Sequence, residues 1–264
     1  MSNIKSEYEL LTDIAQSNIT KTNTNIEKHY LKGWTLTLGT TATDIGSTTY
    51  DEIVLPTSDQ ALQISSSNAF DLLTQILVTG YNDNFEPIQE VVSLSNVSSQ
   101  LPVNLVNSYF RIKQMRVVSA STPTGDIYLY KSGAALLAGV PQLSSDFIYV
   151  LKNPDNLGTI MNLFIPPQEN GYLIPNYVNC SVFNSATVVV FDFQMKYSDS
   201  ANWITEFKFH VGSNENFTWP LNGISKIPNN DLSKGIDVRL QATRVGGGSS
   251  IVSASIALLS TQID

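Results

Sequence analysis

One segment alternates apolar and polar side chains almost without exception. Within residues 187–197, alternate positions hold Val189, Phe191, Phe193, Met195 and Tyr197, and the positions between them include Asp192, Gln194 and Lys196. Successive side chains of a strand point to opposite faces, so this pattern predicts an antiparallel strand with one core face and one solvated face. Residues 203–211, 236–243 and 252–258 repeat the pattern. On the 203–211 strand it assigns Trp203 and Phe207 to the same face.

Further strands, most of them shorter, are predicted in the first half of the chain. They cover residues 34–38, 62–64, 76–78, 88–94, 109–118 and 126–131. Residues 80–84 read Gly-Tyr-Asn-Asp-Asn, and Gly and Asn tolerate the positive φ values of tight turns, so the strands on either side are predicted to form a hairpin. Short strands separated by turn-rich joints are typical of a β-sandwich.

The N-terminus is the one place where a helix of some length is expected. Ser6 and Glu9 fit a capping box, Tyr8 and Leu11 belong to an apolar stripe, and Ile14 lies beside that stripe. An isolated helix of this length is marginal in water, so the stripe must pack on the chain's own domain or on a neighbouring subunit. Tyr8, Leu11 and Ile14 are therefore candidate interface residues.

The predicted fold class is all-β, with two antiparallel β-sandwich domains, jelly-roll-like or immunoglobulin-like, after a short helical arm. The expected limits are 1–30 for the arm and its connector, 31–138 for the first sandwich and 139–264 for the second. The boundary falls within residues 132–145, where small residues, Pro141 and serines indicate a packed connector.

Composition bears on the partners of the chain. Only 14% of its 264 residues are charged, while Ser, Thr and Asn are abundant. An uncharged polar surface loses its water at little cost, which suits protein contacts, although an ordinary β-rich composition has the same property. A net charge of -8 argues against a nucleic-acid partner, because phosphate binding requires clustered cations.

The single cysteine, Cys180, excludes an intrachain disulfide framework and allows folding in a reducing cytoplasm. The first residues lead into no apolar signal segment, and no run of about 18 apolar residues follows. The chain is therefore expected to be neither secreted by such a signal nor embedded in a membrane.

No catalytic, metal or cofactor site is predicted. His29 and His210 are expected on the surface, and together with Cys180 they offer no zinc-ligand spacing. Residues 246–250, Gly-Gly-Gly-Ser-Ser, join two strands without a following lysine, so a hairpin loop is expected instead of a phosphate cradle.

Two carboxylates are candidates for a glycosidase pair, because such an enzyme needs only two acids in one groove. Asp192 and Glu206 are predicted on the polar faces of neighbouring strands. The interleaved Lys196 and Lys208 favour a cross-strand charge ladder instead. Trp219 stands before Pro220, where a loop aromatic serves either as a sugar platform or, more often, as an interface anchor.

Several segments resemble a β-structured module of tailed-bacteriophage virion proteins. They are the serine-rich residues 64–69, the hairpin and following strand 76–94, and the segments 107–112 and 125–128. Residues 203–211, 217–220 and 237–243 are similar to the sandwich that often follows this module, so the resemblance covers most of residues 60–264.

The resemblance implies a non-enzymatic structural component of a phage particle, without telling capsid from neck or tail. Such a chain would be made in the host cytoplasm, would need no cofactor, and would bind other virion proteins and copies of itself. The alternative is a receptor- or glycan-binding module, an adhesin or part of a tail fibre, that uses loop aromatics such as Trp219. An enzymatic function is the third and least favoured hypothesis.

Overall fold

The computed structural model describes residues 26–38, 40–44, 54–120, 122–153, 162–167, 171–183, 188–200, 202–220, 235–246 and 250–262. All helical or strand structure in this part of the chain is β-strand, and the pairings between strands are antiparallel. The all-β, antiparallel fold class is therefore confirmed. The described part contains no helix long and apolar enough to span a membrane. The predicted helix with Tyr8, Leu11 and Ile14 lies outside the described residues.

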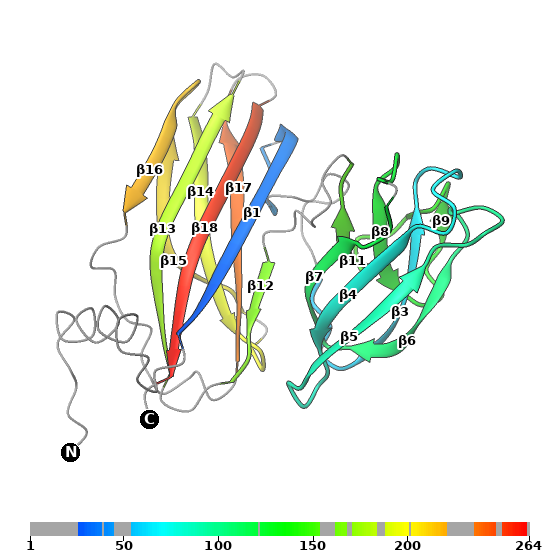
Figure 1. Cartoon of the computed structure of the whole chain (residues 1–264). Helices are drawn as coiled ribbons and strands as arrows, with labels where there is room; N and C mark the ends of the chain where they lie inside the picture. The colour runs from blue at the N-terminus through cyan, green and yellow to red at the C-terminus, as the bar shows by residue number, and fades with distance from the viewer. Residues whose placement is uncertain are drawn as a thin grey trace.

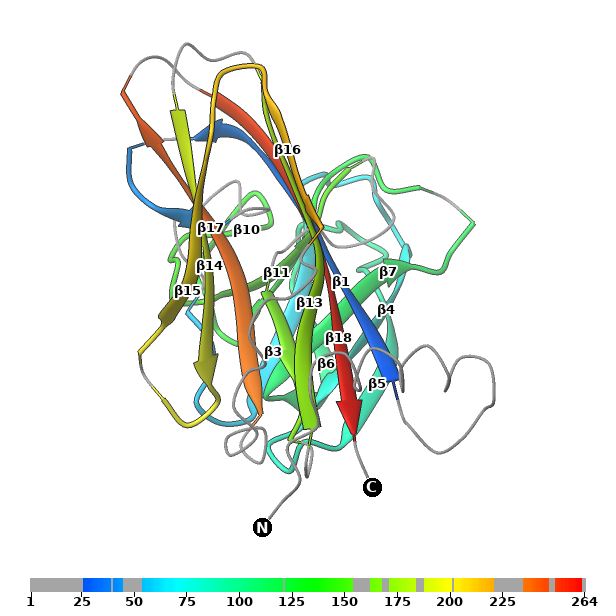
Figure 2. The same cartoon turned by 90° about the vertical axis from the view of Figure 1, so that its left-hand side faces the viewer.

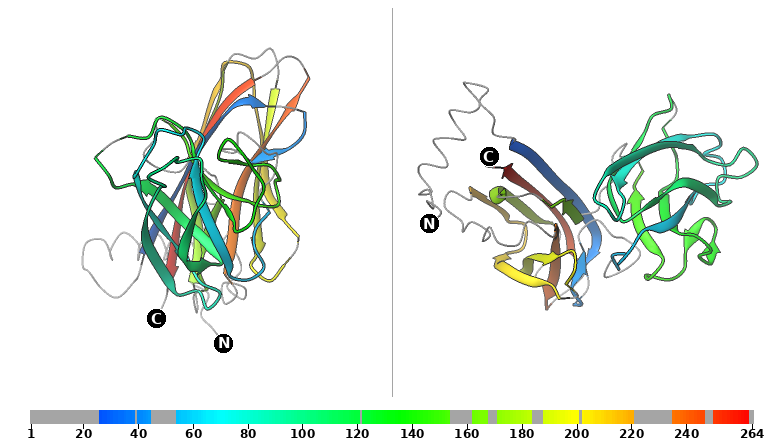
Figure 3. Two further views of the ribbon diagram at one scale, coloured as in Figure 1. Left: turned by 90° about the vertical axis from the view of Figure 1, so that its right-hand side faces the viewer. Right: turned by 90° about the horizontal axis from the view of Figure 1, so that it is seen from below.

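The described strands form two lobes that lie side by side (Figures 1 and 3). We call the first the terminal lobe, because it combines strands from both ends of the chain. Its strands are β1 (Ile26–Leu38), β2 (Thr43–Asp44), β12 (Asn162–Ile165), β13 (Gly171–Phe183), β14 (Val188–Tyr197), β15 (Ile204–Val211), β16 (Asn216–Pro220), β17 (Ile236–Val245) and β18 (Ser250–Gln262). They make one sheet in the order β1-β18-β13-β16 and a second in the order β12-β17-β14-β15, with β2 paired to β17 (Figure 2).

One apolar core fills the space between these two sheets. Val182 of β13 and Val252 of β18 come from the first sheet, and Phe191 of β14 and Val238 of β17 come from the second. Phe191 stacks on Phe209 of β15, with ring centroids 5.3 Å apart. The core face predicted for residues 187–197 is thus present, because Val189, Phe191 and Phe193 are fully buried.

The inserted lobe comprises the strands between β2 and β12. They are β3 (Gln60–Ser66), β4 (Gln75–Tyr81), β5 (Pro87–Ser93), β6 (Val103–Tyr109), β7 (Arg111–Val117), β8 (Ile127–Lys131), β9 (Leu136–Leu137), β10 (Val140–Pro141) and β11 (Phe147–Leu151). A sheet in the order β11-β8-β3-β6 and a sheet in the order β5-β4-β7 enclose a core of their own, and β9 and β10 form a small hairpin. Ile64, Ile76 and Leu129 are fully buried in this core.

The strand pairings divide the chain between the two lobes at other positions than the predicted domain boundaries, 30/31 and 138/139. β1 starts at Ile26, inside the expected arm and connector, and pairs along its length with β18 near the C-terminus. β11 lies within the range 139–264 expected for the second domain, yet it pairs with β8 of the inserted lobe, and all its side chains are buried. The expected connector 132–145 contains the β9–β10 hairpin. Strand periodicity carries no information on which strands pair over long sequence distances, so these assignments required the structure.

Local turn predictions had mixed outcomes. The β4–β5 hairpin is confirmed, and Asn82 closes its turn by accepting the backbone N–H groups of Asn84 and Glu86. The long strand expected over 109–118 is instead two strands, because Phe110 interrupts it and donates its N–H to Tyr81. The expected hairpin at 246–250 is wrong: β17 and β18 belong to different sheets, so their connection crosses between the layers of the terminal lobe.

Candidate functional site

The outer face of β17 carries a row of buried polar side chains. Asp237, Arg239 and Gln241 alternate with the core residues of the strand, and the sequence placed them on a solvated face. Each of the three is at most 6% exposed, so this expectation is wrong. Gln241 donates to the Asp44 carboxylate over 3.0 Å, and Arg239 donates to the side-chain oxygen of Gln194 over 2.8 Å.

A β-bulge explains how part of this row is covered. Phe193 of β14 pairs with Phe207, but the next residue, Gln194, pairs with Thr205, so Glu206 is an extra residue in β15. One extra residue moves the side chains before it to the opposite face of the sheet. Trp203 therefore lies on the outer face, with its ring 4.0 Å from the guanidinium carbon of Arg239, and not on the core face as predicted.

The inserted lobe covers the other end of the row through an ion pair between the lobes. Arg111, the first residue of β7, approaches the carboxylate of Asp237 with two nitrogens: Nε lies 2.7 Å from Oδ1 and Nη2 lies 2.8 Å from Oδ2. Its remaining nitrogen, Nη1, donates to the carbonyls of Pro56 and Phe110. Asp237 is completely buried and Arg111 is 4% exposed. Both charges thus have hydrogen-bonding partners that replace lost water, as buried charges require.

An aromatic cluster surrounds this ion pair. Phe164 of β12 in the terminal lobe contacts three rings of the inserted lobe, with centroid distances of 5.5 Å to Tyr81 and 5.8 Å to both Phe85 and Phe110. The Arg111 guanidinium carbon lies 3.8 Å from the centroid of the Phe110 ring. We call Arg111, Asp237 and these four aromatic residues the interlobe joint. Its contacts combine a bidentate ion pair, a cation–π contact, and both edge-to-face and stacked ring packing, which together fix orientation as well as distance.

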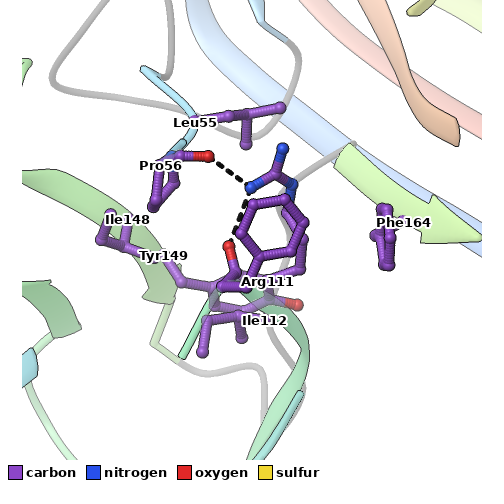
Figure 4. A pocket seen from close by; sticks show the side chains of 8 residues that line it. Leu55, Pro56, Arg111, Ile112, Ile148, Tyr149 and Phe164 are labelled. Atoms are coloured by element: carbon purple, nitrogen blue, oxygen red, sulfur yellow. Dashed lines mark hydrogen bonds between the residues drawn. The ribbon is translucent and has the colours of Figure 1, made fainter. Parts of the chain in front are cut away.

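A small cavity beside Arg111 is too small for a substrate. Its volume is about 20 Å³, and its walls include Pro56, Tyr149 and Phe164 (Figure 4). A water molecule needs at least about 10–15 Å³ measured in this way, so the space has room for one water at most. Burial raises the pKa of the Tyr149 hydroxyl, which stays protonated at neutral pH. The cavity is therefore a packing feature of the interlobe joint.

A larger depression of about 520 Å³ opens on the inserted lobe next to the joint. It is lined by Thr79, Gly80, Tyr81, Pro87, Ile88, Gln89, Lys113 and Gln114. This lining supplies amide groups, a tyrosine and one ammonium group, but it holds no carboxylate that would pair with the ammonium as acid and base. Among the described residues, no three His, Cys, Asp or Glu side chains are grouped as a metal site would need.

The four predicted interface residues are not brought together in the described part of the chain. Trp219 lies in β16, where its backbone pairs with Val178 of β13, and the structure describes nothing of its side chain. Tyr8, Leu11 and Ile14 are outside the described residues. Their role at an interface stays a prediction.

The structure pairs one member of the candidate carboxylate pair with a lysine. Asp192 and Lys208 are cross-strand partners with their charged atoms 2.9 Å apart, so this rung of the predicted charge ladder is confirmed. Asp192 is nevertheless only 7% exposed, not solvated as predicted, while Glu206 is exposed in the bulge. His210 is exposed as expected. Cys180 is a free, buried thiol whose pKa is raised by that burial.

Sequence reasoning missed the residues of the interlobe joint. Asp237 alternates with apolar residues just as a residue on a solvated face does, and a strand whose polar face is covered by polar partners produces the same pattern. The one signal in the sequence is the local density of charge: the chain has 14% charged residues, yet β17 holds three charged residues among ten, Asp237, Arg239 and Arg244.

Comparisons with known proteins show no family. No protein-family model matches the chain, and no curated protein is similar enough to count as a relative. Solved structures that align include that of infectious bursal disease virus, Gt strain, with 14% identity over 94% of this chain and 77% of the other and a TM-score of 0.26. The VP2 subviral particle of the same virus aligns with 15% identity over 90% and 71% and a TM-score of 0.22. The PBSX exported protein XepA aligns with 11% identity over 89% and 86% and a TM-score of 0.16. These scores are too low to support an argument about this chain.

Proposed function

We propose that the chain is a non-enzymatic structural component of a bacteriophage virion, which assembles through protein–protein contacts on the capsid, neck or tail. The observation that carries this proposal is the interlobe joint. The chain uses two buried charges, Arg111 and Asp237, to hold two lobes in one orientation. A fixed two-lobed body suits a part that must repeat the same contacts in every copy of an assembly.

Two further observations support this function. Residues 60–264 resemble the virion module described above, and the two layers of each lobe fit the two β-sandwiches that the resemblance implies. The surface is poor in charge, which lowers the cost of removing water when large areas are buried between subunits. The buried thiol of Cys180 is compatible with synthesis in the host cytoplasm, followed by residence in the particle.

Quantitative mass spectrometry of purified particles tests the proposal. The expected result is that the chain is present at a fixed ratio to the major capsid protein, in a copy number that matches a symmetry of the particle, and that it stays with the particles through a density gradient. Absence from mature particles would contradict the proposal. A ratio that varies between preparations would also contradict it, because it indicates a contaminant.

A further inference from the structure

The inserted lobe has an end that is held rigidly yet exposes apolar side chains. It is formed by the β3–β4 connection (67–74), the β5–β6 connection (94–102) and the segment around the β9–β10 hairpin (132–143), which together we call the tip. The backbone N–H of Ser66 donates to Ser99, and that of Ser99 donates to Ala69, which ties the first two segments together. The Ser65 hydroxyl donates to the carbonyl of Gly139, which ties in the third. Figure 1 shows this end, marked by β9, away from the terminal lobe.

Large apolar side chains project from all three segments of the tip. Phe70 is 86% exposed, Val97 is 78% exposed and Leu137 is 68% exposed. Leu72, Leu73 and Leu101 are exposed as well. Single exposed apolar residues are ordinary, but a group of them on adjoining loops marks an interaction site.

A buried carboxylate keeps the first of these loops in place. Asp71 lies between Phe70 and Leu72 and is 5% exposed. It accepts hydrogen bonds from the Ser66 hydroxyl over 2.5 Å, the Thr124 N–H over 2.7 Å and the Gly125 N–H over 2.9 Å. Burial alone would raise the pKa of Asp71, but these donors outweigh it and lower the pKa. The neighbours of Asp71 are therefore turned outward by a satisfied polar anchor.

The backbone of the tip adopts conformations that cost energy. Leu73 has φ = 57° and Ala138 has φ = 49°, in the left-handed region that residues with a Cβ rarely occupy. Such conformations persist only where the surrounding contacts impose them, and they gather at functional positions. The tip therefore presents its apolar groups in a fixed arrangement, which lowers the entropy lost on binding.

The charge of the tip points to its occupant. Its three segments contain no ionisable side chain except Asp71, which is buried and anchored. Copies of a chain with a net charge of -8 repel each other, so contact between copies is favoured where each presents an uncharged surface. A lipid bilayer fits less well, because the tip offers no Lys or Arg for anionic headgroups.

We propose that the tip is a homotypic assembly surface, through which the inserted lobe of one copy packs against the inserted lobe of another. This inference rests on the proposed structural function and names one contact by which copies assemble. The contact uses the exposed apolar side chains of Phe70, Val97 and Leu137, one from each segment of the tip, and Asp71 is the positioning residue that holds Phe70 in place.

Sedimentation analysis of the full chain over a wide concentration range tests this contact. The test variant combines Phe70→Ser, Val97→Ser and Leu137→Ser. The matched control combines Phe183→Ser, Val188→Ser and Val245→Ser, which are also exposed but lie in the terminal lobe. We expect the natural chain to self-associate, the tip variant to have a Kd at least about tenfold higher, and the control to behave like the natural chain. Circular dichroism and thermal unfolding check that each variant is folded.

A second variant guards against loss of fold in the first. Phe70→Lys changes one position that is 86% exposed and places a cation in an apolar contact, so it should weaken self-association while leaving the melting temperature unchanged. A natural chain that is monomeric at every concentration would overturn the inference. Binding of that monomer to phosphatidylcholine vesicles through the tip would instead identify a lipid surface as the partner, and it would overturn the inference too. Equal weakening by the control, or no weakening by the tip variants, would also overturn it.

These outcomes are separable from those that test the proposed function. If the chain is a fixed component of particles but both tip variants self-associate like the natural chain, the proposed function stands and the tip contact fails. If the chain is absent from particles, yet self-associates through the tip, the contact stands and the virion role fails.

Discussion

Arg111 and Asp237 are 126 positions apart in the sequence, yet they form a bidentate ion pair that excludes solvent. Arg111 belongs to the inserted lobe and Asp237 to the terminal lobe, and each lobe has a core of its own. The pair therefore couples the stability of the terminal lobe to that of the inserted lobe. Taking two charges out of water is expensive, and the gain here is a defined orientation more than a large stabilisation.

A double-mutant cycle measures this coupling. Asp237→Leu alone leaves the Arg111 guanidinium buried without its partner, and we expect it to lower the free energy of unfolding by about 3–5 kcal/mol. Arg111→Met in the same chain removes the stranded charge and should recover much of that loss. Denaturant unfolding of the two single variants and the double variant gives the coupling energy. Additive losses would show that the two side chains act independently.

Phe164 should connect the unfolding of the two lobes. Phe164→Ala removes a ring that is 3% exposed and packed against Tyr81, Phe85 and Phe110, and such a truncation costs about 3–5 kcal/mol. We expect calorimetry to resolve two transitions in this variant where the natural chain shows one. Phe183→Ala serves as the control, because its ring is half exposed, and it should leave a single transition. A single transition in Phe164→Ala would contradict coupling through this residue.

Two glycines test the rigidity of the tip. Gly133 and Gly139 both have positive φ values, 83° and 77°, so an alanine at either position costs about 1–2 kcal/mol from backbone conformation. A Cβ at Gly133 would meet open space, whereas one at Gly139 would collide with the carbonyl oxygen of Ser66. Gly139→Ala should therefore destabilise the chain by about 1–3 kcal/mol more than Gly133→Ala. Equal melting temperatures for the two variants would contradict the close approach of the hairpin to β3.

The lowered pKa of Asp71 should make the stability of the folded chain fall at acid pH. Its pKa is lowered below the ordinary value of 3.8 in the folded chain, so its ionised form contributes stability above that value and loses it as pH falls through the lowered pKa. Asp71→Asn keeps the shape but weakens charge-assisted hydrogen bonds, which costs about 2 kcal/mol at neutral pH. The difference in unfolding free energy between the natural chain and the variant should shrink below pH 3.8. A difference that is constant with pH would show that the charge of Asp71 is not stabilising.

Local features of the fold were predictable from the sequence, and long-range ones were not. Alternation in residues 188–197 correctly identified a strand with a core face, and Gly and Asn in residues 80–84 identified the β4–β5 hairpin. Both follow from side-chain period and turn chemistry, which act over a few residues. The pairing of β1 with β18 joins opposite ends of the chain, and no local pattern encodes it.

The candidate site escaped prediction for a related reason. Alternation cannot distinguish a polar row that faces water from one that another lobe covers, so Asp237 was assigned to the solvated face. The bulge at Glu206 reverses the expected side of Trp203, and a single extra residue leaves the composition of a strand unchanged. The side chains that pair with this row, Arg111 above all, show that the outer face of β17 joins the two lobes.

A symmetry-averaged density map of the intact particle tests the central claim most directly. We predict repeated two-lobed density into which the terminal and inserted lobes fit together as one body, without separate adjustment, and in which inserted-lobe tips of neighbouring copies meet. A well-resolved particle map that has no density for this chain at any position on the capsid, neck or tail would contradict the claim that it is a structural component of the virion.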